Sequence, residues 1–155
     1  MRVRLSPEIG SETADVIFEM GGPHVSVATY LAFAEVCATL RRKRNAGTIS
    51  EPSFRAARLN VEIEVLRNPT VIMLSVDDQA MVGGVALCDQ HGINASDAAS
   101  LYSLLRYARA ARPSAIALMV ATDQRLLRAA RAEGLGTVNP ETLDGVEARR
   151  LIEGA

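Results

Sequence analysis

Three carboxylates stand out in the sequence because of where they lie. Glu35 is the only charged residue between Val27 and Leu40, and Asp97 and Asp123 lie where predicted helices begin. Each also has a plain structural interpretation: an exposed helix residue for Glu35, a partner of the helix dipole for Asp97 and an N-cap for Asp123. Carboxylates that gather at one point repel one another, so they bind cations or acquire raised pKa values. We therefore treat these three as candidate site residues.

Arginine supplies nearly all of the positive charge of this 155-residue chain, whose net charge is −1. It is clustered at 41–44, 106–112 and 125–131. The planar guanidinium suits phosphate groups, whereas charged helix faces are also common on any soluble surface, and both interpretations stay open. A near-neutral total argues against a general nucleic-acid coat but allows a basic rim around an acidic site.

Composition predicts one folded domain over residues 1–155. Hydrophobic residues make up 48% and charged residues 23%, which are ordinary globular values. The longest apolar runs, such as 115–121, are far shorter than the roughly 20 residues of a membrane span, and no apolar segment follows the first arginines. We therefore expect a soluble protein that stays in the cytoplasm.

The cysteines and histidines do not suggest a zinc site. Cys37 and Cys88 are far apart, and neither His24 nor His91 clusters with them, whereas zinc requires about four gathered ligands. We expect both thiols to be reduced and buried as small hydrophobic side chains. The histidines are expected at the surface or at helix caps.

The positions of turn residues predict an α/β chain. Apolar strands separated by helices require crossover connections, and therefore a parallel sheet with helices on both faces. Ligands in such folds bind beyond the carboxyl ends of the strands. Asp77 and Asp78 follow one strand but fit a helix N-cap equally well, so we leave them out of the site. The predicted strands are 24–28, 70–76, 114–121 and 135–138, and the predicted helices are 6–20, 29–45, 51–67, 78–91, 96–112 and 123–133.

Several segments, in the same order along the chain, resemble the PIN-domain family, and the bacterial VapC-type toxins in particular. The likeness covers almost the whole chain. The matching segments are Pro7–Glu12 (PEIGSE), Ser26–Val36 (SVATYLAFAEV), Asn94–Leu101 (NASDAASL), Val120–Leu126 (VATDQRL), Ala129–Leu135 (AARAEGL) and Asn139-Pro140.

This resemblance implies a PIN-like three-layer fold and a metal-dependent endoribonuclease toxin that hydrolyses RNA phosphodiester bonds with Mg²⁺ or Mn²⁺. Glu35 matches the second acid of the family, Asp97 the third and Asp123 the fourth, and Thr122 matches the hydroxyl residue beside the last acid. A cognate small antitoxin would neutralise the toxin, which would form a homodimer. We expect the three acids to converge at the carboxyl edge of one parallel sheet, with Arg41, Arg42 and Arg125 contacting RNA phosphate.

The sequence departs from the family pattern at its start. The family opens with a strand that carries the first Asp, and Met1–Pro7 contains no acid. With three carboxylates we expect weak binding of Mg²⁺ or Mn²⁺ and either slow cleavage of RNA or none. The alternative is a degenerate, non-catalytic PIN-like module that binds protein. A nucleotide-binding domain is a weaker third possibility, because neither a G-x-G-x-x-G nor a Walker sequence is present.

Overall fold

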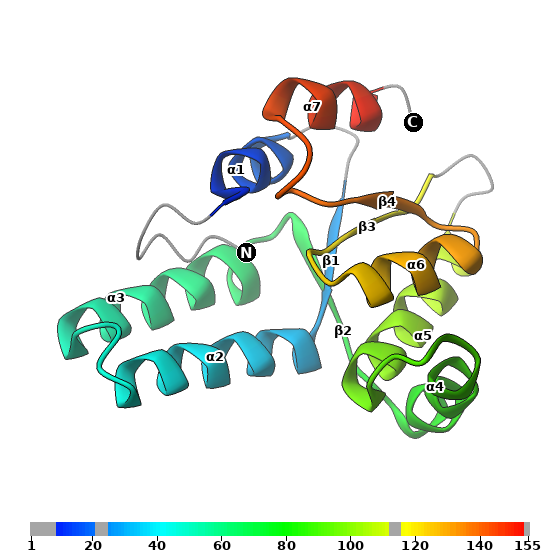
Figure 1. Ribbon diagram of the computed structural model, residues 1–155, viewed down its shortest axis with the longest axis horizontal. Helices are drawn as coiled ribbons and strands as arrows, with labels where there is room; N and C mark the ends of the chain where they lie inside the picture. The colour runs from blue at the N-terminus through cyan, green and yellow to red at the C-terminus, as the bar shows by residue number, and fades with distance from the viewer. Residues whose placement is uncertain (1–8, 21–24, 112–115, 154–155) are drawn as a thin grey trace.

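The computed structural model of the chain (Figure 1) describes residues 9–20, 25–111 and 116–153. Within these ranges the chain forms seven α-helices, one π-helical turn and four short strands. The elements are, in chain order, α1 (Ser11–Glu19), β1 (Ser26–Thr29), α2 (Tyr30–Asn45), α3 (Glu51–Val61), the π-helical turn η1 (Glu62–Leu66), β2 (Val71–Leu74), α4 (Asp78–His91), α5 (Ala95–Ala110), β3 (Leu118–Val120), α6 (Gln124–Ala132), β4 (Gly136–Val138) and α7 (Gly145–Glu153). The predicted α/β class of the chain is confirmed.

The strands pair two by two, and both pairs are parallel. In the first pair, Ser26 of β1 lies opposite Val71 of β2, and in the second, Leu118 of β3 lies opposite Gly136 of β4. Figure 1 shows the two pairs near the centre, with α2 and α3 on one side and α4, α5 and α6 on the other. Parallel pairing follows from the crossovers, since helices connect the two strands of each pair. The single sheet that the sequence predicts, and its three layers, stay a prediction.

The strands are shorter than the sequence predicts. The segment 70–76 forms strand only at 71–74, because Asp77 then turns the chain into α4. An Asx turn begins the strand, in which Asn68 Oδ1 accepts the backbone N–H of Thr70 at 3.0 Å and its hydroxyl at 2.7 Å. The segment 114–121 likewise forms strand only at 118–120, and its first two residues lie outside the described ranges.

Polar side chains cap the helices that surround the strands. Thr29, Ser50, Asp77, Asn94 and Asp123 each accept a backbone N–H from the first turn of the following helix, at 2.7 to 3.2 Å. Such a cap satisfies a donor that has no partner within the helix and contributes about 1 kcal/mol. These caps confirm the predicted starts of α2, α3, α4 and α6, whereas α5 begins one residue before the predicted position.

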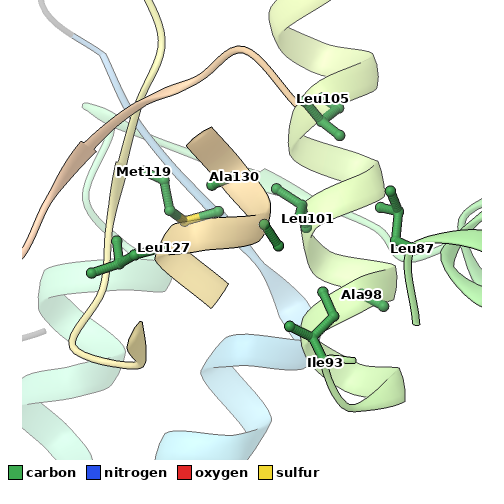
Figure 2. Close-up of a cluster of buried hydrophobic side chains, with 9 residues drawn as sticks. Leu87, Ile93, Ala98, Leu101, Leu105, Met119, Leu127 and Ala130 are labelled. Atoms are coloured by element: carbon green, nitrogen blue, oxygen red, sulfur yellow. The ribbon is translucent and has the colours of Figure 1, made fainter. Parts of the chain in front are cut away.

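One hydrophobic core joins α4, α5, α6 and β3. Figure 2 shows Leu101 of α5 between that helix and α6, with the side chain of Met119 of β3 extending toward α6. The helices α4 and α5 pack closely where Gly84 meets α5, because a Cβ at Gly84 would lie 2.9 Å from the backbone nitrogen of Ala99. The buried members of this core are Leu87, Ile93, Ala98, Leu101, Leu105, Met119, Leu127, Ala129 and Ala130. Their packing holds α4, α5, α6 and β3 together.

A second core lies between α2 and α3, which form the helical pair that extends to one side in Figure 1. Its buried members are Leu40, Phe54, Ala57, Val61 and Val65, with Phe33 and Val36 packed against them. The apolar side chains of Phe33, Val36 and Leu40 therefore lie on the side of α2 that packs against this core. This packing leaves the opposite side of α2, which carries Glu35, exposed.

The two ends of the described chain pack together, and the sequence predicts neither end correctly. Gly10 adopts a φ of +86°, so α1 begins at Ser11 and not near the predicted Ser6-Pro7, which lies outside the described residues. The buried Thr13 hydroxyl donates to the carbonyl of Leu143 at 2.7 Å and ties α1 to the segment before α7. Helix α7 was not predicted, although Asp144 accepts backbone N–H groups from its first turn, as in an ordinary N-terminal cap.

His91 is not the surface or capping residue that the sequence predicts. Its imidazole is only 10% exposed, and Nε2 lies 2.9 Å from Glu133 Oε1, so the pair links the ends of α4 and α6. His24 lies outside the described residues. Both cysteines are free and half-buried, and the guanidinium of Arg58 donates to Cys37 Sγ at 2.9 Å.

Candidate functional site

The three predicted carboxylates come from different parts of the fold. Glu35 lies in the second turn of α2, directly after β1, and Asp123 caps α6 directly after β3. Asp97 lies in the first turn of α5. The carboxyl ends of parallel strands are where ligands bind in such folds, and two of the three acids follow such ends.

The electrostatics of Asp97 show that these carboxylates interact. Burial, first of all, raises the pKa of Asp97 above its ordinary value, and the charges of Glu35 and then Asp123 raise it further. The hydrogen bond from Asn94 acts in the opposite direction. Asp97 is half-buried, whereas Glu35 and Asp123 are exposed. The fold therefore brings the three acids within electrostatic range, with Asp97 as the most enclosed member.

Asn94 holds the Asp97 carboxylate in one orientation. Its amide Nδ2 donates to Asp97 Oδ2 at 2.6 Å, while its Oδ1 accepts the backbone N–H of Asp97 at 2.9 Å. The Ser96 hydroxyl also donates to Asn94 Oδ1, at 2.8 Å. The sequence analysis missed Asn94, although an Asn three residues before an Asp at a helix start is a recognisable capping signal.

Asp123 serves the fold as well as the candidate site. Its Oδ1 accepts the backbone N–H groups of Arg125 at 2.7 Å and Leu126 at 3.1 Å, which confirms the interpretation of Asp123 as an N-cap. Both bonds go to the same oxygen. Thr122, the predicted hydroxyl neighbour, is exposed beside it.

The chemistry of the donors, more than their spacing, fits a hard divalent cation. Carboxylate oxygens are the ligands of Mg²⁺ and Mn²⁺, and Mg²⁺ commonly takes one or two of them together with several waters. Within the described ranges, no three Asp, Glu, His or Cys side chains are gathered closely enough to hold one metal ion. The residues therefore fit a hydrated ion held through one or two carboxylates, and not a closed set of three protein ligands.

The arginines predicted to contact RNA are already engaged within the protein on α2. The guanidinium of Arg41 lies 4.5 Å from the ring centroid of Phe54, and that of Arg42 donates to the Thr39 hydroxyl at 2.8 Å. A guanidinium stacked on a ring can still present its edge to phosphate. The third predicted residue, Arg125, is exposed two positions after Asp123. Contact between these arginines and phosphate stays a prediction.

Asp77, left out of the predicted site, has a structural role. Arg106 Nη1 donates to both of its carboxylate oxygens, at 2.8 and 2.9 Å, and Asp77 also caps α4 through the N–H of Ala80. The hydrogen bond from Arg106, and after it that from Ala80, lowers the pKa of Asp77 below its ordinary value. The pair lines a shallow hollow of about 350 Å³ at the end of β2.

Comparisons of the chain with protein-family models, with curated proteins and with solved structures give no match. No helix in the part of the chain that the structure describes is long and apolar enough to cross a membrane. The family resemblance therefore stays a prediction. What the structure itself provides is a half-buried carboxylate, Asp97, which the amide of Asn94 holds in place and whose pKa the charges of Glu35 and Asp123 raise.

Proposed function

We propose that this chain is a metal-dependent endoribonuclease of the PIN-domain type, similar to VapC toxins and neutralised by a small cognate antitoxin. The observation that carries the proposal is the electrostatic interaction of Asp97 with both Glu35 and Asp123, each from a different element. These are the three acids at which the sequence resembles the family. A cytoplasmic homodimer acting on RNA is part of the same proposal.

The residues of the candidate site have different roles in the proposed reaction. Asp97, oriented by Asn94, and the exposed Glu35 and Asp123 create a concentration of negative charge that favours cation binding. A Mg²⁺ or Mn²⁺ ion held by one or two of these carboxylates would supply an activated water and would stabilise the negative charge that develops during phosphodiester hydrolysis. Thr122 would present its hydroxyl beside Asp123, and Arg125 would attract the RNA backbone.

A non-catalytic, protein-binding module is the second candidate. It is favoured by the wide spacing of the carboxylates, which form no three-ligand metal group among the described residues. It is also favoured by the capping role of Asp123, since one carboxylate oxygen is already committed to the backbone of α6. In that case the same acidic surface would bind a partner protein.

The experiment that separates the two candidates is an RNA cleavage assay with 1 mM Mn²⁺ (about the concentration at which weak carboxylate sites fill). Wild-type protein and Asp97→Asn are purified in parallel, so that contaminating ribonuclease contributes equally to both. We expect slow cleavage by the wild type that EDTA abolishes and that Asp97→Asn lacks. Equal cleavage by both proteins, or none by either, would contradict the catalytic proposal and favour the binding module.

A further inference from the structure

A single buried hydroxyl joins three elements next to the carboxylates. Thr29 is the last residue of β1 and is 1% exposed. Its Oγ1 accepts the backbone N–H of Ala32 at 3.0 Å and so caps α2. The same Oγ1 lies 3.1 Å from the hydroxyl oxygen of Ser100 on α5, within hydrogen-bond distance. We call this contact between the two hydroxyls the Thr29–Ser100 bridge.

The Thr29–Ser100 bridge lies between the helices that carry two of the acids. Ser100 is three residues beyond Asp97, so the two side chains lie on the same side of α5, one turn apart. Glu35 lies on α2, the helix that Thr29 caps, about 9 Å along the axis from that cap. A shift of α2 against α5 would therefore change the spacing of Glu35 and Asp97.

The like charges of Glu35 and Asp97 oppose the approach of their helices. Two ionised carboxylates repel each other most when water is partly excluded, and Asp97 is half-buried. A hydrogen bond between the buried Thr29 and the half-buried Ser100 at the junction of the two helices resists that repulsion, because breaking it leaves the buried Thr29 hydroxyl without one of its partners. The bridge is thus placed where it counteracts the separation of the acids.

We propose that Thr29 and Ser100 are positioning residues, whose hydroxyl bridge sets the spacing of Glu35 and Asp97 for divalent cation binding. This inference rests on the proposed function, because it needs the carboxylates to bind a cation. The cap and the bridge share Thr29 Oγ1 but have different partners, Ala32 N–H in the cap and the Ser100 hydroxyl in the bridge. A substitution of Ser100 therefore removes the bridge and leaves the cap in place.

The test compares two Ser→Ala variants of the same helix. Ser100→Ala removes the bridge, whereas Ser103→Ala removes a buried hydroxyl that donates only to the Ala99 carbonyl of α5, at 2.9 Å. Binding of Mn²⁺ alone is measured from the electron paramagnetic resonance signal of the free ion, and urea unfolding is followed in parallel. We expect Ser100→Ala to weaken Mn²⁺ binding about tenfold, the lower end for outer-shell substitutions. Ser103→Ala should leave Mn²⁺ binding unchanged, even if it lowers the free energy of unfolding as much as Ser100→Ala does.

Two substitutions of Thr29 test the same contact from its other side. Thr29→Ser keeps the hydroxyl and should bind Mn²⁺ as the wild type does, whereas Thr29→Val should lose affinity as Ser100→Ala does. If the wild type binds Mn²⁺ and both Ser→Ala variants bind it equally well, the bridge is structural only, and this inference is wrong while the proposed function stands. If the wild type binds no Mn²⁺, the proposed function fails, and the inference fails with it.

Discussion

The substitution Asp97→Asn should cost less stability at neutral pH than the matched substitution Asp78→Asn. Both acids lie in the first turn of a helix, α5 and α4 respectively. Burial and the charges of Glu35 and Asp123 raise the pKa of Asp97 above its ordinary value of 3.8. The folded state therefore keeps a proton over a pH range in which the unfolded state has lost it. Stability falls as pH rises from about 3.8 through the folded pKa, and at neutral pH the whole cost is present.

The magnitude follows from the partial exposure of the three acids. Solvent screens Glu35 and Asp123, so relief of the repulsion at Asp97 should contribute about 0.2–1 kcal/mol, as for other solvent-screened charge pairs. Both variants also lose the interaction of a carboxylate with a helix N-terminus, which is worth about 0.3–1 kcal/mol. The amide in Asp97→Asn keeps an acceptor oxygen for Asn94. The difference between the two variants therefore reports the burial of the Asp97 charge together with its repulsion by Glu35 and Asp123.

Urea unfolding measured between pH 7 and pH 4 provides the assay. Asp97→Asn should be more stable than Asp78→Asn at pH 7 by the amount given above. The advantage should shrink as the pH falls and the Asp97 carboxyl takes up its proton. If Asp97→Asn loses as much stability as Asp78→Asn, or more, at every pH, then the carboxylates do not repel one another in the folded protein.

Three further pairs of substitutions test individual contacts of the structure. Arg41→Ala should lower the free energy of unfolding by about 0.5–1 kcal/mol, because it removes a guanidinium stacked on an aromatic ring of α3, whereas Arg42→Ala should not; urea unfolding measures both. Asp123→Ala should cost about 1 kcal/mol through loss of the α6 cap, and Asp123→Asn only a few tenths; equal losses in thermal melts would contradict the capping role. Gly10→Ala should destabilise more than Gly47→Ala, because both have positive φ but only at Gly10 would the new Cβ meet backbone, at 2.7 Å; equal losses in urea unfolding would show that the contact at Gly10 relaxes.

The sequence predicted those elements whose signals are local. Ser50 predicts the start of α3 and the apolar residues 71–74 predict β2, and both signals lie within the element or directly beside it. The short helix α7 has a similar local signal, because Asp144 accepts a backbone N–H from its first turn. This helix could therefore have been predicted from the sequence. The start of α1 depends instead on Gly10, which has a positive φ and packs against the backbone of residues 140–141. That contact is far away in the sequence and has no local signal.

The candidate site could be predicted only in part because its members meet through tertiary contacts. Asp97 and Asp123 were recognisable from their positions at predicted helix starts, and Glu35 was recognisable as the only charged residue in an apolar segment. Their mutual repulsion, in contrast, depends on how α2 and α5 are placed. The contact of Thr29 with Ser100 spans 71 residues and has no local signature. The predicted surface or capping role of His91 was wrong for the same reason, since its partner Glu133 is 42 residues away in the sequence.

The central proposal is that one hydrated cation binds among Glu35, Asp97 and Asp123, held directly by one or two of them, and titration with Mn²⁺ under nuclear magnetic resonance tests it most directly. A bound paramagnetic ion broadens the signals of nearby backbone amides even when binding is weak. We predict that the amides at 34–36, 96–98 and 122–124 broaden first and together, and that Asp97→Asn abolishes the effect at all three segments. Broadening that begins elsewhere, for example at 77–78, or that persists in Asp97→Asn, would contradict the claim.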